Sequence, residues 1–341
     1  MRLVHLSALL PIVALSGDPI ALLQAKELHC EPERGFLASV LKELRIDPSS
    51  QMLVFSKSSL QGQVSPKNPR AIYFNEYSYV AWIPAAPLLE IMTVDPAKGP
   101  QFYTIMNRAG GTIRTEDSQC FRCHGRSPVQ LIARSSIVAP SGYPRVDQRS
   151  RLVGPETPIE ERWGGWYVTG THGTMRHMGN VLSTPADEPV KLDKEAGANR
   201  TELSPFIDTS KYLTPHSDIV ALMVFEHQME IQNAISAVAT KGSNASVDHL
   251  VDVLLGVGEV KLTSTVTGTS GFRDYYQQRY PKDQKGRSLG DLDLRTRLLK
   301  YSCSPMVYSA AFQALPQKDE ILTKLKARCT PEAREILSGT L

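Results

Sequence analysis

Short apolar runs that lack a helical period fill the first half of the chain. They cover residues 52–55, 71–74, 77–82, 89–94 and 101–105. Asn75 and Glu76 separate the second run from the third, and a turn signal rich in Pro and Gly at residues 95–100 separates the last two. Aromatic and β-branched residues dominate the runs, as is typical of strands joined by short turns. The pattern predicts an antiparallel meander, with further strands at residues 131–138 and 166–171.

The last third of the chain changes to the helical period. Apolar residues recur every three or four positions over residues 217–240, which predicts one long helix. Shorter helices are expected over residues 33–44, 247–255, 294–301, 306–315, 320–327 and 332–337. Residues 184–211 are polar and rich in Pro, Asp and Glu, which favours a linker or a long surface loop. We therefore predict an α+β protein, with an antiparallel β-rich region over residues 17–183 and a mainly helical region over residues 212–341 packed on it.

The first 16 residues resemble an export signal. Arg2 gives a positive start, residues 3–15 are mostly apolar, and Ala14 and Ser16 supply the small side chains that a signal peptidase reads. A buried N-terminal helix is the alternative. The apolar run is too short to span a bilayer, and no later run approaches the roughly 20 apolar residues of a membrane helix. We expect an exported, periplasmic protein with no transmembrane segment in the mature chain.

The composition is that of an ordinary globular protein. Hydrophobic residues make up 41% of the 341 residues and charged residues 21%, so a core of normal size can form. The formal net charge is only +3. This small value argues against nucleic acid as the main partner, because nucleic-acid binding usually requires a strongly basic face. It leaves room for a modest basic patch that docks an acidic redox partner.

One short motif carries specific chemistry. Cys120, Cys123 and His124 form a Cys-x-x-Cys-His pattern, in which two thiols add across the vinyl groups of one porphyrin and the histidine becomes the proximal iron ligand. A thioredoxin-like redox pair should instead open a helix in a βαβ unit, and a zinc site needs a second pair of ligands at regular spacing. The motif occurs once, so we predict one covalent haem c.

The sixth iron ligand is sought in the glycine-rich residues 163–180. This segment contains two histidines and two methionines within seven residues, and both residue types serve as sixth ligands in cytochromes. We rank His177 first as the candidate distal ligand, followed by Met178, His172 and Met175. The alternative is a glycine-rich hairpin whose polar side chains face solvent.

Other polar groups have weaker claims to a role. Glu226 and His227 lie in the long predicted helix, where an acid–base group over a haem and a structural polar patch are both open interpretations. Arg122 and Arg126 flank the motif and are candidates to pair with haem propionates, with surface solvation as the default. Of the three cysteines outside the motif, Cys303 and Cys329 are the pair most suited to a disulfide, and burial as reduced thiols is the alternative.

The residues also resemble a known group of proteins. The stretch Cys120-Phe121-Arg122-Cys123-His124-Gly125 matches the haem-binding motif of c-type cytochromes. The chain as a whole resembles large, single-haem bacterial proteins that are usually labelled only as cytochrome c domain proteins. The resembling stretches are residues 53–57, 69–75, 163–180, 226–228, 286–289, 301–304 and 315–316. The resemblance implies haem c and a periplasmic setting, and it assigns Cys120, Cys123 and His124 as haem residues. It implies no particular reaction.

Three functions are compatible with this sequence. The first is electron transfer to or from a redox partner protein or a small-molecule donor or acceptor. The second is a haem enzyme, an oxidoreductase with peroxidase-like or other small-molecule redox activity. The third is a noncatalytic haem-based sensor. We favour electron transfer, because it is the commonest use of covalently attached haem.

Overall fold

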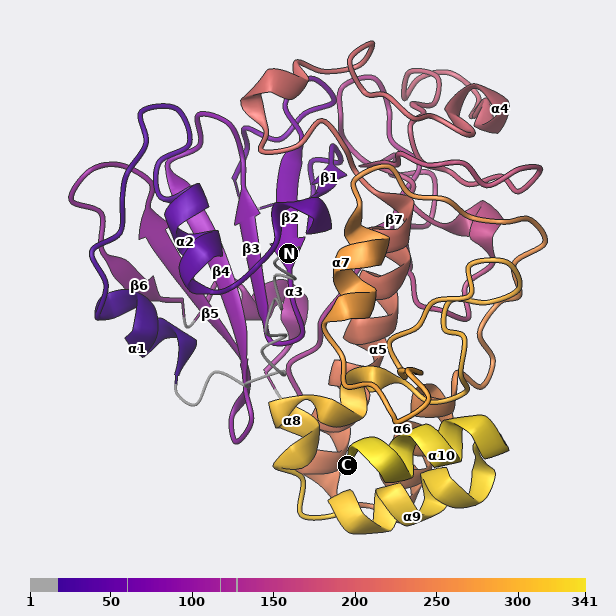
Figure 1. Ribbon diagram of the computed structural model, residues 1–341. Helices are drawn as coiled ribbons and strands as arrows, with labels where there is room; N and C mark the ends of the chain where they lie inside the picture. The colour runs from indigo at the N-terminus through magenta and orange to yellow at the C-terminus, as the bar shows by residue number, and fades with distance from the viewer. Residues whose placement is uncertain (1–17, 60, 117, 127) are drawn as a thin grey trace, which may run out of the picture.

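The computed structural model describes residues 18–341 with the exception of residues 60, 117 and 127. The export signal expected at residues 1–16 lies outside the described residues. The N-terminal part of the chain forms an antiparallel sheet, and a helical C-terminal part packs against one face of that sheet (Figure 1). This arrangement confirms the predicted α+β class.

Seven strands form the main sheet in the order β6–β5–β4–β3–β2–β1–β9. They are β1 (Met52–Val54), β2 (Arg70–Phe74), β3 (Ser78–Trp82), β4 (Leu88–Asp95), β5 (Gly99–Met106), β6 (Ile113–Thr115) and β9 (Trp166–Tyr167). The first six pair antiparallel in sequence order, which confirms the predicted meander. β9 returns from a distant part of the chain to pair with β1.

The strands expected at residues 131–138 and 166–171 are much shorter than predicted. β7 (Arg134–Ser135) pairs only with β8 (Arg151–Leu152), in a separate two-stranded ladder. The ladder ends there because the backbone N–H of Ser136 donates to the carbonyl of Gly164, 2.9 Å away, instead of to β8. β9 likewise stops after Tyr167.

The helices of the described residues are α1 (Pro19–Gln24), α2 (Leu37–Glu43), α3 (Phe121–His124), α4 (Lys194–Gly197), α5 (Ile219–Lys241), α6 (Asn244–Leu255), α7 (Phe272–Gln278), α8 (Ala310–Gln313), α9 (Lys318–Arg328) and α10 (Pro331–Thr340). Four short 3₁₀ turns are η1 (Pro48–Ser50), η2 (Ile159–Glu161), η3 (Thr209–Lys211) and η4 (Pro305–Tyr308). Within the described part of the chain, no helix combines the length and the apolar character needed to cross a membrane.

Two of the predicted helices fail for local reasons. Residues 294–301 are not helical, because Leu294 has a φ of +58°, in the left-handed region that a right-handed helix excludes. The Asp293 carboxylate accepts from the backbone N–H and the hydroxyl of Thr296, which holds this turn. Residues 306–315 divide into η4 and α8 at Ser309, whose hydroxyl caps α8.

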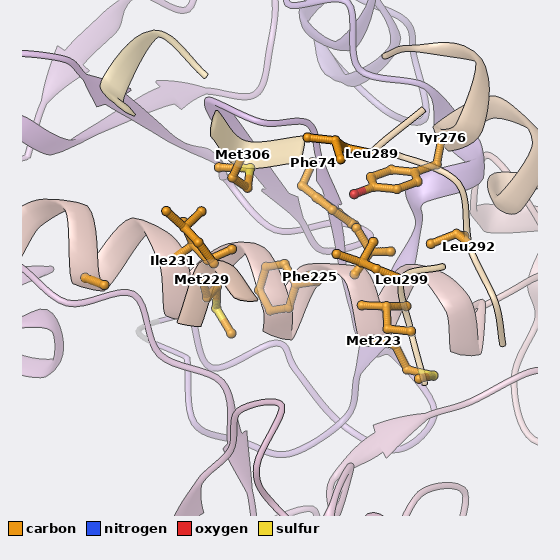
Figure 2. Packing of buried hydrophobic residues seen from close by; sticks show 14 of the residues in the cluster. Phe74, Met223, Phe225, Met229, Ile231, Tyr276, Leu289, Leu292, Leu299 and Met306 are labelled. Atoms are coloured by element: carbon orange, nitrogen blue, oxygen red, sulfur yellow. The ribbon is translucent and has the colours of Figure 1, made fainter. Parts of the chain in front are cut away.

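The central helix is α5, and its ends are set by its caps. The Asp218 carboxylate accepts from the backbone N–H groups of Val220 and Ala221 at 2.7 and 3.3 Å, and Gly242 ends the helix at a φ of +58°. Most of the helix is buried, because the sheet covers one side and the C-terminal helices another. Figure 2 shows that Met229 extends from the side of α5 opposite to Ile231.

Alternating side chains of the sheet enter two different cores. Tyr73 and Val80 face the core that contains α1 and α2, which cover the near face of the sheet in Figure 1. Phe74 and Tyr79, their chain neighbours, face the core that contains α5 and the C-terminal helices. The second face therefore joins the β-rich and helical regions into a common core. The candidate site lies on this face.

The expected linker is partly ordered, and the expected disulfide between Cys303 and Cys329 does not form. Residues 184–211 contain the short helix α4, and Leu203 and Ile207 within them are buried in the core of α1 and α2. Cys303 and Cys329 are buried free thiols. Burial, together with the neighbouring Cys329 thiol, raises the pKa of Cys303.

Candidate functional site

A cavity of about 360 Å³ opens on the face of the sheet that α5 covers. Cross-strand pairs form its floor: Tyr79 and Phe102 both pair with Met92, the first across β3 and β4 and the second across β4 and β5. Because directly opposed residues share a face, these three side chains lie in one row. Ala81, Glu90 and Thr104 make a second, parallel row. The two rows give the cavity a broad wall that is mostly apolar.

The Cys-x-x-Cys-His motif forms another wall of this cavity. Cys120, Cys123 and His124 all line it, and residues 121–124 form the one-turn helix α3. The ring of His124 packs against that of Phe102, with their centroids 4.8 Å apart. The helix ends at Gly125, whose φ of +71° favours glycine. The predicted haem residues are thus brought together at one cavity.

One hydrogen bond fixes the tautomer of the His124 ring. Its Nδ1 lies 2.7 Å from the carbonyl oxygen of Gln130. A carbonyl only accepts, so Nδ1 donates, and the lone pair of the neutral ring is on Nε2, where it is available to a metal. Burial lowers the pKa of His124, although the Gln130 carbonyl opposes that effect. A neutral ring is the form that binds metal.

The two motif thiols do not fit the rival chemistries. Burial raises the pKa of the Cys120 thiol to about 11, and the charges of Glu90 and Glu116 act in the same direction. A thioredoxin-like nucleophile needs the opposite, a lowered thiol pKa. Among the residues that the structure describes, no three His, Cys, Asp or Glu side chains are grouped as a metal site. This leaves the zinc interpretation without its further ligands there.

A polar network occupies one part of the cavity. Arg70 and Glu90 form an ion pair at 3.3 Å, and the amide of Gln61 donates to Glu90 at 3.1 Å. The Thr104 hydroxyl donates to Glu116 at 3.0 Å. All five residues line the cavity, which therefore has a polar part as well as an apolar one. This division suits a ligand with a flat apolar body and a few charged groups.

Two hydrogen bonds attach the segment after the motif to α5. Asn233 accepts from the backbone N–H of Leu131 at 2.7 Å and donates to its carbonyl at 2.9 Å. Leu131 lines the cavity, as do Phe225 and Met229 on the preceding turns of α5. Helix α5 therefore provides a wall of the cavity and holds the chain that follows His124.

His177 lies elsewhere in the structure. It is 1% exposed, its ring centroid is 5.2 Å from that of Trp163 and 4.7 Å from that of His172, and its Nδ1 accepts from the backbone N–H of Gly179. Burial lowers the pKa of His177 to about 3. Neither His177 nor the other ranked candidates, His172, Met175 and Met178, line the cavity. The structure does not bring them to His124.

Glu226 and His227 are interior polar groups outside the cavity lining. One carboxylate oxygen of Glu226 accepts from Arg162 at 2.9 Å, and the other accepts from the Trp163 indole at 2.9 Å. Burial nevertheless raises the pKa of Glu226 to about 7. His227 pairs with the Ser304 hydroxyl at 2.9 Å. These contacts favour the structural interpretation over a distal acid–base role.

Sequence reasoning missed the two methionines that do line the cavity, Met92 and Met229. Met92 lies two residues after Glu90 on β4 and therefore on the same face, and Met229 follows Phe225 by one turn on α5. Both spacings are visible in the sequence, yet neither indicates that the two residues meet. Only the packing of α5 over the sheet places both at the cavity of His124.

No family model, curated protein or solved structure matches this chain. Functional inference therefore depends on the residues and their geometry.

Proposed function

We propose that this protein is a periplasmic c-type cytochrome that carries one covalent haem and exchanges electrons with a redox partner. The observation that carries the proposal is the meeting of Cys120, Cys123 and the Nε2-accessible His124 at one largely apolar cavity. When bound, haem supplies an iron that changes between two oxidation states.

The protein residues hold and tune that group. The Cys120 and Cys123 thiols would attach the porphyrin, and His124 would bind the iron through Nε2. The hydrogen bond from Nδ1 to the Gln130 carbonyl holds the ring orientation and raises the basicity of Nε2. The apolar floor excludes water, which limits the reorganisation that accompanies a change of charge. Arg70, which pairs with Glu90, lines the cavity and would accompany a haem carboxylate there.

In this proposal a methionine thioether would also hold the iron, on the side away from His124. Met92 and Met229 line the cavity, whereas His177 does not. Met229 is the stronger candidate, because it comes from α5, a wall of the cavity other than the sheet. Met92 lies beside Phe102 in the sheet, and the Phe102 ring packs against His124, so Met92 is on the same side of the cavity as His124. A ligand on the same helix as Asn233 is also held firmly relative to the segment that follows the motif.

An absorption spectrum of the exported, purified protein tests the proposal. We expect haem that stays with the denatured polypeptide after acid extraction, and no such haem in a Cys120→Ala/Cys123→Ala variant. Cys30→Ala is the matched control, because Cys30 is a free cysteine outside the cavity lining and its loss should leave the haem in place. Colourless wild-type protein in a strain that matures other c-type cytochromes would refute the proposal.

The second candidate function is a haem enzyme. The observation in its favour is Glu90, a carboxylate on the cavity wall that is held by Gln61 and Arg70 and is able to move protons. The enzyme requires an open sixth position, and the electron-transfer protein a filled one. Slow or absent carbon monoxide binding by the reduced protein supports electron transfer, and rapid binding supports the enzyme.

A further inference from the structure

Arginine is concentrated in the part of the chain around the haem motif. Residues 106–151 contain eight arginines, no lysine and only three carboxylates, although the whole chain has a net charge of +3. The rest of the chain is therefore slightly acidic. Such a strong local excess of one sign creates a directed field at one region of the surface.

Most of these arginines are exposed and form no ion pair with the carboxylates that the structure describes. Arg145 pairs with Asp147, and Arg151 pairs with Glu161. The other six are exposed and belong to none of the ion pairs found among the described residues: Arg108, Arg114, Arg122, Arg126, Arg134 and Arg149. Their charge is available to a partner.

One of these six arginines lines the cavity, and three others are neighbours of lining residues along the chain or across the sheet. Arg122 lies between the two motif cysteines, and Arg126 follows His124 with its guanidinium over the ring of Phe121 at 5.2 Å. Arg134 itself lines the cavity. Arg114 is the cross-strand partner of Thr104, which also lines it, so the two side chains leave the sheet on the same face.

Exposed apolar residues accompany this charge. Tyr143 is 59% exposed and Leu152 is 55% exposed, values that are unusual for large hydrophobic side chains. Leu152 pairs with Arg134 in the small β7–β8 ladder. Lys57 lies 4.7 Å from the centre of the Tyr143 ring and is followed by the cavity residue Ser58. Arginine, tyrosine and exposed apolar groups together are typical of protein interfaces.

We propose that an arginine face, defined by Arg114, Arg122, Arg126, Arg134, Tyr143 and Leu152, docks an acidic redox protein. This inference rests on the proposed haem function. Cys123 is exposed and lies between Arg122 and Arg126 in the chain, so a group attached to it would be within reach of a partner on the arginine face. In the docked pair one electron leaves the donor centre and enters the acceptor centre, with no atom or proton transferred.

A protein fits the arginine face better than an anionic membrane does. Electron exchange requires that a second redox centre come close to Cys123, and phospholipids carry none. The basic side chains of residues 106–151 are arginines throughout, and their planar guanidinium groups can bind carboxylates through two parallel hydrogen bonds. The apolar side chains Tyr143 and Leu152 would supply the desolvated centre of the interface.

The test compares two variants of equal charge by stopped-flow spectroscopy, with reduced flavodoxin, a small acidic electron carrier, as the donor. Arg122→Glu/Arg126→Glu reverses two charges on the arginine face. Arg273→Glu/Lys282→Glu reverses two exposed charges outside it. Each variant must first show the wild-type haem spectrum. If the wild type itself shows no haem, it is the proposed function that fails, and the docking surface is rejected with it.

We expect the arginine-face variant to be reduced at least about tenfold more slowly than the wild type at low salt, because electrostatic steering changes association rates by 10- to 1000-fold. The control should change less than about twofold, and 0.5 M salt should remove the difference. Leu152→Asp should also slow the reaction. Equal rates for the two charge variants would overturn the inference. So would binding of the wild type to phosphatidylserine vesicles that depends on Arg122 and Arg126 while flavodoxin reduction does not.

Discussion

The buried carboxyl of Glu226 should make the stability of this protein fall as the pH rises. Arg162 and Trp163 hold it at 2.9 Å each and favour the ionised form, whereas burial favours the protonated form and has the larger effect. The pKa of Glu226 is therefore raised from 4.5 to about 7. Glu226→Gln is the informative perturbation, because it removes the titration and nearly preserves the volume.

The magnitude follows from proton linkage. Between pH 4.5 and pH 7 the unfolded chain loses the proton of Glu226 while the folded protein retains it, so folding becomes less favourable as the pH rises. Integrated from pH 5 to pH 8, a shift of this size lowers the free energy of unfolding by about 2.5 kcal/mol. The Glu226→Gln variant lacks this contribution. From pH 5 to pH 8 it should lose about 2.5 kcal/mol less stability than the wild type.

Urea denaturation of both proteins at pH 5 and pH 8 measures this double difference, which is the change in unfolding free energy of the wild type between the two pH values minus the same change for the variant. Other titrating groups are common to the two proteins and cancel. Glu332→Gln, at an exposed position on α10 with no ion pair among the described residues, is the control and should follow the wild type. A double difference near zero would show that burial does not raise the pKa of Glu226. A difference of opposite sign would show that the Arg162 ion pair dominates.

Three further predictions concern the cavity and α5. Met229→Leu should abolish the sulfur-to-iron charge-transfer absorption of the oxidised protein and allow carbon monoxide to bind the reduced protein. His177→Gln should leave both properties unchanged. A normal spectrum for Met229→Leu, with the effect appearing in Met92→Leu instead, would assign the ligand to β4. Asn233→Ala removes both hydrogen bonds to Leu131 and should lower the free energy of unfolding by about 1–3 kcal/mol in urea titrations. Asn199→Ala removes a hydrogen bond outside the cavity and should leave the haem spectrum unaltered. Asp218→Ala unpairs the first turn of α5 and the N–H groups of Thr269 and Ser270, so a loss of about 2–4 kcal/mol is expected, and a loss below 0.5 kcal/mol would contradict the cap.

The sheet was predictable because its determinants are local. Tyr73 and Phe74 are both apolar, and their alternation sends one to each face of a sheet that is covered on both sides. Turn residues at Asn75 and Glu76 then fix the pairing of β2 with β3. The false helix at residues 294–301 had a suitable apolar spacing, but the turn that Asp293 stabilises competes with it and wins.

The cavity was predictable only in part. Cys120, Cys123 and His124 are adjacent in sequence, so the motif alone brings them together. Met229 reaches the same place only through the packing of α5, more than 100 residues later in the chain. His177 shows the limit of reasoning from composition, because a segment dense in histidine and methionine need not line the cavity. Its Nδ1 is engaged by Gly179, and its ring fills space beside Trp163.

The Cys-x-x-Cys-His motif cannot hold its own shape and depends on the fold around it. Helix α3 has four residues, far fewer than an isolated helix needs to be stable in water. Its position must therefore come from its surroundings: Phe102 of β5 contacts the rings of both Phe121 and His124, and Asn233 of α5 fixes Leu131 beyond the motif. The sheet and α5 are thus the parts that give His124 a defined position. One short motif therefore depends on a large fold, because both elements are needed to contact Phe121, His124 and the segment that follows them.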